Sequence, residues 1–136
     1  MSERRIIVHS LEHARAALEA AAALNKPVIL MSARGIASFM GPLWFRALID
    51  MARAARPEAK CRAVLDCADE AGTVLAALRT GIERARFGGP EETRARLDEI
   101  ACQIGASVEA AGPYEGLDLL DTREPERACH EFLARD

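Results

Sequence analysis

Side chains that could act as acids, bases, metal ligands or phosphate holders follow five short apolar runs of this sequence. In chain order they are His9 and Ser10, Ser32 and Arg34, Asp66 and Cys67, Gly88 and Gly89, and Glu109. In parallel α/β folds the carboxyl ends of the strands lie at one edge, and ligands bind there. If the apolar runs are parallel strands, these residues form the best candidate site in the chain.

Three members of this set are candidates for proton transfer. A carboxylate within the short run "ASVEAA" is costly to bury unless it is paired or faces a polar site, which singles out Glu109. Asp66 could transfer a proton, or it could accept backbone N–H bonds in a turn. His9 ends an apolar run and is either an acid–base residue or a hydrogen-bonded structural residue. We interpret Asp66, Glu109 and His9 as the candidate catalytic residues.

The remaining members are candidates for holding a ligand or a metal. Ser32, Arg34, Gly88 and Gly89 are the candidate ligand-binding residues, whereas Ser10 is better explained as a helix cap. Cys67 is the candidate metal ligand, and its alternative is an inert, buried thiol. The four cysteines, at positions 61, 67, 102 and 129, form no C-x-x-C pair. Neither a G-x-G-x-x-G nor a Walker loop is present, and no G-x-S-x-G turn surrounds a serine.

The elements that must position these residues alternate between short apolar runs and stretches of helical periodicity. Strands are predicted over 5–10, 27–33, 61–67, 82–87 and 106–111, with a further apolar patch at 117–120. Helices are predicted over 11–25, from Gly41 and Pro42 to about Arg56, up to Gly81, from Pro90 to Gly105, and over 123–134. The pattern indicates an α/β fold, with five parallel strand–helix units in one domain spanning residues 1–136.

The composition excludes several classes of partner. The 136 residues carry 18 basic and 21 acidic side chains, interleaved, for a net charge of -3. Such a charge balance provides no field that would attract nucleic acid, so we expect no nucleic-acid partner. No apolar run approaches the length of a membrane span, and the N-terminal segment "MSERRIIVHS" lacks the apolar core of a signal peptide. We therefore expect a cytoplasmic protein without a membrane partner.

The order of these segments resembles the class II fructose-bisphosphate aldolases, which are zinc-dependent TIM barrels. The stretches that carry the resemblance are "LEHARAALEAAAALNKPVIL", "VILMSARGIASFMG", "VLDCADEAGTVLAALRTGI", "IGASVEA" and "TREPERACHEFL". The likeness covers the first five strand–helix units, and none of its motifs is highly specific. It implies a truncated, TIM-barrel-like arrangement, with an open sheet as the alternative.

The resemblance also assigns roles, and the sequence departs from them. Asp66 matches the family's catalytic aspartate, whereas Cys67 stands where the family has a zinc-binding histidine. Glu109 matches the first acid of a Glu-x-Glu motif, whose second acid is replaced by Ala111. The family's other zinc ligands and its phosphate-binding loops have no counterpart in this sequence. Catalytic zinc needs about three protein ligands. The cofactor is therefore unknown, and we do not expect zinc.

Two arginines in the fourth predicted strand are unusual for a buried sheet. Arg84 and Arg86 are two residues apart and therefore share a face. Because guanidinium groups are expensive to bury, that face is expected to be exposed, at a sheet edge, or paired across an interface. Five strands cannot close an eight-stranded barrel, and proteins usually cover unpaired edges. We therefore expect a homo-oligomer.

Three functions agree with these observations. The first is a non-catalytic aldolase-like domain that binds a small molecule, such as a small anionic ligand, or a protein. The second is a metal-assisted carbon–carbon lyase or isomerase on a reduced scaffold. The third is a structural or regulatory oligomer. The incomplete set of metal ligands favours the first, and the sequence names no ligand.

Overall fold

The computed structural model describes residues 4–135, so the first three residues of the N-terminal segment lie outside it. The chain divides into two compact units. The first contains the chain up to Met31, residues 47–62 and the chain from Glu115 onward, and the second contains residues 32–46 and 63–114. The expectation of a single domain stays a prediction.

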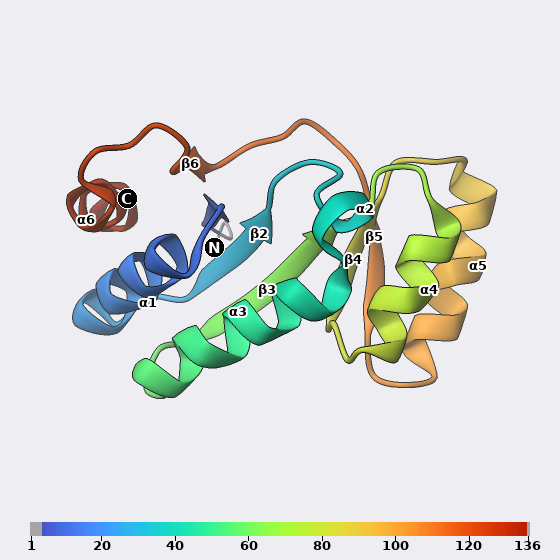
Figure 1. The fold of residues 1–136 in the computed structure, drawn as a ribbon, viewed down its shortest axis with the longest axis horizontal. Coiled ribbons are helices and arrows are strands. Elements are labelled where there is room, and N and C mark those ends of the chain that lie inside the picture. Colours follow the sequence, from blue (N-terminus) through green and yellow to red (C-terminus); the bar gives the residue numbers. More distant parts are fainter. Residues whose placement is uncertain (1–3, 136) are drawn as a thin grey trace. The chain divides into compact units, whose positions relative to one another are not determined.

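Strands and helices alternate along the chain, as the sequence predicts (Figure 1). The strands are β1 (Arg5–Val8), β2 (Val28–Ser32), β3 (Cys61–Asp66), β4 (Arg84–Phe87), β5 (Ser107–Ala110) and β6 (Leu117–Asp118). The helices are α1 (Leu11–Leu24), α2 (Ala37–Met40), α3 (Pro42–Ala55), α4 (Ala71–Arg79), α5 (Glu91–Cys102) and α6 (Pro125–Ala134). Only the one-turn helix α2 was not expected.

The strands form one open sheet in the order β5-β4-β3-β2-β1-β6. The pairs β1–β6, β3–β4 and β4–β5 are parallel. The first five strands therefore keep their sequence order, while the short sixth strand pairs with the first. This arrangement confirms the predicted α/β class, the parallel open sheet and the TIM-barrel-like order of its units.

In the first unit, helix α1 packs against β1 and α6. Ser10 caps α1, because its side chain accepts a hydrogen bond from the His13 N–H. Asn25 ends the helix in the left-handed conformation, with φ 51°, which satisfies its last carbonyl groups. Both ends of this helix lie where the sequence predicts them.

In the second unit, α4 packs on β4, α5 packs on β5, and the two helices lie side by side (Figure 1). The register aligns Leu65, Ala85 and Val108 in one row across β3, β4 and β5, and all three are buried. The next row contains Asp66, Arg86 and Glu109. Because side chains alternate along a strand, this polar row lies on the opposite face of the sheet.

The outer edge of β5 is covered by side chains of α5. The Val108 N–H donates to Asp98 Oδ1 over 2.8 Å, and the Val108 carbonyl accepts from Arg94 Nη1 over 2.8 Å. An uncovered edge would offer these backbone groups to another strand. Here Asp98 and Arg94 form the hydrogen bonds that a neighbouring strand would otherwise form.

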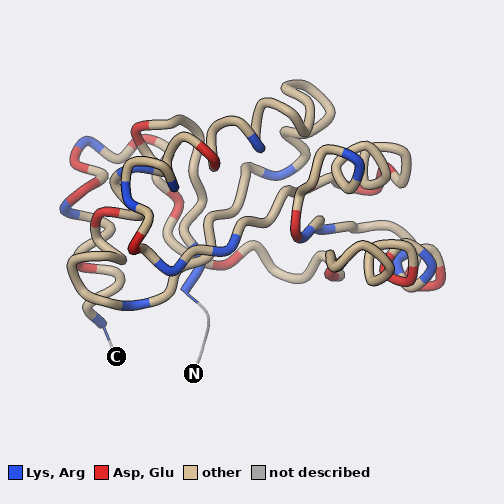
Figure 2. The backbone as a smooth tube through the Cα atoms, turned by 90° about the horizontal axis from the view of Figure 1, so that it is seen from below, with Lys and Arg blue, Asp and Glu red and all other residues tan. Residues whose placement is uncertain are grey.

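Charged residues of both signs are scattered along the backbone rather than gathered in one segment (Figure 2). No helix within residues 4–135 is both long enough and apolar enough to cross a bilayer.

Candidate functional site

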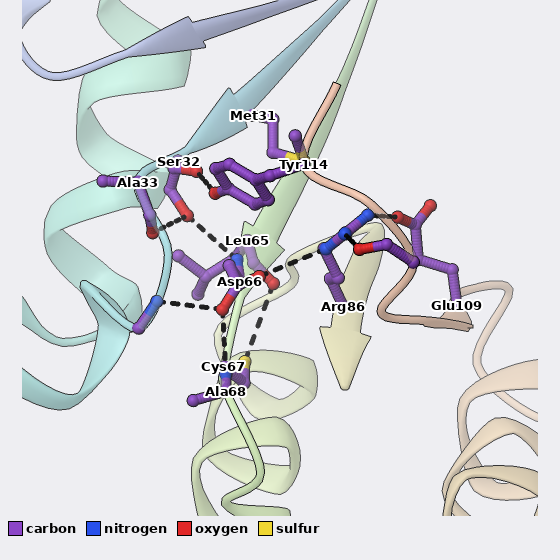
Figure 3. Close-up of polar contacts among 12 residues, drawn as sticks. Met31, Ser32, Ala33, Leu65, Asp66, Cys67, Ala68, Arg86, Glu109 and Tyr114 are labelled. Carbon is purple, nitrogen blue, oxygen red and sulfur yellow. Dashed lines mark hydrogen bonds and ion pairs between the residues drawn. The ribbon is translucent and has the colours of Figure 1, made fainter. Parts of the chain in front are cut away.

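Asp66 lies at the end of β3, in the second unit, and its carboxylate is enclosed by hydrogen bonds (Figure 3). Oδ1 accepts from the N–H groups of Gly35 and Ala68, each at 2.9 Å. The Asp66 N–H donates to Ser32 Oγ over 2.9 Å. Asp66 and Ser32 are both buried, with exposed fractions of 2% and 0%. Asp66 therefore ties the ends of β2 and β3 together.

The bond from Ala68 to Asp66 also holds an unfavourable turn. Ala68 has φ 51°, a left-handed conformation that is uncommon for a residue with a Cβ atom. Its N–H is bound by Asp66, and its carbonyl accepts from the Gly88 N–H at 2.7 Å. The turn is thus fixed from both sides, which is the condition under which strained backbone persists.

Arg86 lies at the centre of the polar row. Its Nε is 3.2 Å from Asp66 Oδ2, and its Nη1 is 3.3 Å from Glu109 Oε2. Arg84 Nη1 is 3.6 Å from the other oxygen of Glu109. The two arginines are thus paired with carboxylates of their own chain, and Arg86 is only 5% exposed. The expectation of an exposed, edge or intermolecular arginine face was wrong for Arg86, because the register places it between two carboxylates on an interior strand.

One polar atom of Arg86 is incompletely satisfied. The pair with Asp66 meets the distance of an ion pair, but the buried Nε–H has no hydrogen-bond acceptor in suitable geometry. We regard the contact as electrostatic, because a short distance without alignment gives little hydrogen-bond energy. A buried donor of this kind calls for an explanation in terms of the site.

The loop after β5 folds over this cluster. Arg86 Nη2 donates to the Gly112 carbonyl and contacts the Pro113 carbonyl at 3.4 Å. The Tyr114 hydroxyl donates to the Ser32 carbonyl (Figure 3). The segment from Gly112 to Tyr114 therefore joins the ends of β2 and β4 through three backbone carbonyl groups.

The ring of Tyr114 contacts two guanidinium groups. Arg34 Cζ lies 4.9 Å from the ring centroid, and Arg86 Cζ lies 5.0 Å from it. Both distances fall within the range of cation–π attraction. Arg34 is exposed, and no carboxylate among residues 4–135 forms an ion pair with it. Arg34 therefore contributes a positive charge that the cluster does not neutralise.

The thiol of Cys67 lies in surroundings that do not resemble a metal site. Its thiol is fully buried and directed at the Leu65 carbonyl, 3.7 Å away. Burial, with smaller contributions from Asp66 and Glu70, raises the pKa of the Cys67 thiol to about 12. Within residues 4–135 no group of three or more His, Cys, Asp or Glu residues could hold a metal ion. A zinc ion does not fit these residues, because zinc binds thiolates gathered with further ligands.

Gly88 and Gly89 begin the connection from β4 to α5. The Gly88 N–H is engaged by the Ala68 carbonyl. A Cβ atom on Gly89 would lie 2.3 Å from the ring of Phe87, so packing alone requires a glycine there. Their role in holding a ligand stays a prediction.

His9 has its contacts within the first unit. Its Nε2 lies 2.6 Å from Asp118 Oδ1, and its backbone N–H donates to Nδ1 of His13 at 3.0 Å. Burial, followed by the neighbouring His9, lowers the pKa of His13 below its ordinary value of 6.5. His9 and Asp118 form a partly exposed pair at the ends of β1 and β6.

The second unit thus brings together four of the residues singled out from the sequence, namely Ser32, Arg34, Asp66 and Glu109. Two further residues of this cluster were not among the candidate site residues. The sequence marked Arg86 only as an arginine that is costly to bury, and it did not mark Tyr114. A signal for Arg86 was present in the sequence. One arginine and two carboxylates, all of which cost free energy to bury, occur on three consecutive strands and could pair with one another. No signal identified Tyr114, since it lies in a loop whose course depends on the fold.

Comparisons with known proteins show what this fold is similar to. No protein-family profile matches the chain. The sequence is 27% identical over 133 residues to fructose-bisphosphate aldolase 2 of Cereibacter sphaeroides, covering 88% of this chain and 37% of that protein. The fold is aldolase-like. It superposes on the crystal structure of a proposed fructose-1,6-bisphosphate aldolase from Coccidioides immitis with a TM-score of 0.60.

That structural match has 20% sequence identity and covers 80% of this chain and 45% of the other. The chain therefore spans less than half the length of either protein. The resemblance to class II aldolases inferred from the sequence is confirmed as a likeness of sequence and of fold.

Proposed function

We propose that this chain is a non-catalytic, aldolase-like domain that binds a small anionic molecule at the strand ends of its second unit. The observation that supports the first part is the state of Asp66. Both N–H groups at Oδ1 come from the backbone, and Oδ2 lies beside Arg86. A residue that transfers protons needs an oxygen directed at the reacting group, and this carboxylate is directed at its own chain.

The state of Cys67 supports the same proposal. A thiol with a pKa of about 12 is almost entirely protonated at neutral pH, so it is a poor nucleophile. In the native protein, a thiol reagent at pH 8 should modify the exposed Cys102 and leave Cys67 unmodified. Mass spectrometry of the labelled peptides measures this difference, and rapid labelling of Cys67 would contradict it.

The charge of the cluster supports an anionic ligand. The cluster contains the guanidinium groups of Arg34, Arg84 and Arg86. Arg84 and Arg86 pair with the carboxylates of Asp66 and Glu109. The exposed guanidinium group of Arg34 has no carboxylate partner among residues 4–135. A guanidinium group binds phosphate and carboxylate oxygens through two parallel hydrogen bonds.

Two measurements test the proposal. The purified protein should not cleave fructose 1,6-bisphosphate, with or without added zinc. Isothermal titration calorimetry with inorganic phosphate should show weak binding that Arg34→Ala abolishes and Arg96→Ala preserves. Arg96 is a matched control, because its side chain is 75% exposed and lies on the surface of α5. Cleavage that disappears in Asp66→Asn would instead establish the lyase alternative.

An exposed apolar surface favours a protein-binding function as the second candidate. Phe39 and Met40 in α2 and Leu43 in α3 are 84%, 48% and 68% exposed. Large apolar side chains that are close in sequence and exposed together often mark an interaction site. Light scattering over a range of protein concentrations, on the wild type and on a Phe39→Ser/Leu43→Ser variant, tests this candidate. Identical monomeric behaviour of both would argue against self-association through this surface.

A further inference from the structure

The segment Gly112–Tyr114 occupies groups at the strand ends that could bind a ligand. The carbonyl groups of Gly112 and Pro113 lie against Nη2 of Arg86. The Tyr114 hydroxyl donates a hydrogen bond to the Ser32 carbonyl (Figure 3). The Tyr114 ring contacts the guanidinium groups of Arg34 and Arg86. These contacts engage residues at the ends of β2 and β4.

The two carbonyl oxygens on Arg86 stand where the oxygens of an anion would bind. Guanidinium groups bind oxyanions through N–H groups that lie in one plane and point at two acceptors. Nη2 now directs its N–H groups at a loop that is largely exposed to solvent. The neighbouring buried Nε–H lies 3.2 Å from Asp66 Oδ2 but has no acceptor in hydrogen-bonding geometry. The loop therefore satisfies the donors of Arg86 only in part, and an anion could satisfy them better.

We propose that the segment Gly112–Tyr114 is a built-in occupant of the anion site, which an oxyanion with at least two oxygen atoms displaces. In the closed state the segment accepts hydrogen bonds from Arg86 and covers its guanidinium group. In the bound state the anion accepts hydrogen bonds from Arg34 and Arg86, and Tyr114 leaves the strand ends. This inference rests on the proposed function, because it identifies the chemistry of the ligand at the same site.

The proposal has a quantitative consequence. When a binding-competent state is populated only in part, the apparent dissociation constant rises by the inverse of that fraction. Removing the side chain that holds the segment closed should therefore increase the affinity for the anion. Tyr114 donates a hydrogen bond to the Ser32 carbonyl and contacts Arg34 and Arg86 through its ring. We therefore expect Tyr114→Ala to bind inorganic phosphate about tenfold more tightly.

The experiment compares the wild type with Tyr114→Ala and Tyr114→Phe by calorimetric titration with inorganic phosphate. Tyr114→Phe keeps the ring and removes only the bond to the Ser32 carbonyl, so its affinity should lie between those of the other two. Adding Arg34→Ala to Tyr114→Ala should abolish the gain. Circular dichroism confirms that each variant is folded, and Tyr114→Phe is the variant least expected to disturb folding.

A second readout follows the loop itself. In the wild type, phosphate should accelerate hydrogen exchange of the backbone amides in 112–116, because the segment leaves the site when the anion binds. Parallel titrations with glycerol 3-phosphate and malonate distinguish a phosphate ester from a dicarboxylate as the ligand class. Slower exchange of the segment in the presence of phosphate would mean that it closes over the ligand, and would overturn the inference.

The outcomes separate this inference from the proposed function. Equal phosphate affinities for the wild type, Tyr114→Phe and Tyr114→Ala would overturn the built-in occupant and leave the anion site in place. An absence of phosphate binding in all three proteins would overturn the proposed function and this inference with it.

Discussion

Polar clusters at strand ends occur in both units, and they are built in opposite ways. In the first unit His9 and Asp118 meet at β1 and β6, with side chains 20% and 47% exposed. In the second unit Asp66 and Arg86 meet at β3 and β4, with side chains 3% and 6% exposed. If one side chain of the first pair is removed, water can form hydrogen bonds with the other. The side chains of the second pair are too buried for water to do so. The first cluster should therefore respond to its solvent, whereas the second should determine whether its unit folds.

The largest effect should come from the buried cluster. Arg86→Leu leaves the Asp66 carboxylate buried without a counterion, and Glu109 loses one of its partners. Breaking a buried ion pair by removing one partner typically costs about 3–5 kcal/mol. Chemical denaturation should show a loss of this size in the free energy of unfolding. Arg84→Leu, on the same strand but 21% exposed, is the matched control and should cost much less. Equal losses would show that burial does not distinguish the two arginines.

A smaller effect is expected at the first cluster. Ser10→Ala removes the acceptor of the His13 N–H at the start of α1. Loss of a helix cap usually costs about 1 kcal/mol. Thermal and chemical unfolding measure this loss, and Ser10→Asp should restore most of it because Asp is also a good cap. A loss in Ser10→Ala as large as that of Arg86→Leu would remove the contrast between the two clusters.

The smallest effect concerns pH and is confined to the first unit. His13 Nδ1 accepts the His9 N–H and must therefore be unprotonated, and the pKa of His13 lies below 6.5. The unfolded chain takes up this proton more readily than the folded one. The free energy of unfolding should thus be highest above pH 6.5 and fall as the pH drops from 6.5 towards the lowered pKa.

The groups that act on the His13 pKa are His9, which directly follows β1, Glu12 from its own helix and Asp118 from β6. Denaturation curves at several pH values between 7.5 and 5.5 should show a shallower decline for His13→Gln than for the wild type. His130→Gln, which alters another histidine of the same unit, should leave the decline unchanged. An unchanged slope in His13→Gln would assign the pH dependence to other groups.

The elements of the fold were largely predictable because they depend on local patterns. Apolar runs predicted the five longer strands, and Ser10 marked the start of α1 because serine is a good helix cap. Helix α2 was missed because one turn of four residues is too short to show a helical period. The short strand β6 was predicted only as an apolar patch, because its pairing with β1 depends on the tertiary fold.

The candidate site was predictable only in part, because its residues act in combination. Glu109 was identified from the cost of burying a carboxylate and Asp66 from its place at a strand end, whereas Arg86 was noted only for the cost of burying a guanidinium group. Each cost was evaluated alone, whereas the register brings the three into one row where they compensate each other. Strand register cannot be read from single residues. The position of Tyr114 depends on the course of a loop, which no periodic pattern encodes.

The covered edge of β5 limits edge-to-edge strand pairing between copies of this protein. A half-open sheet should recruit further strands and grow into aggregates. Asp98 and Arg94 lie one helical turn apart on α5 and present a carboxylate and a guanidinium group to the outward-facing N–H and carbonyl groups of Val108. These two side chains form hydrogen bonds with Val108 like those that the backbone of a neighbouring strand would form. Two side chains of one helix thus protect this part of the sheet edge, whereas a closed barrel has no edge to protect.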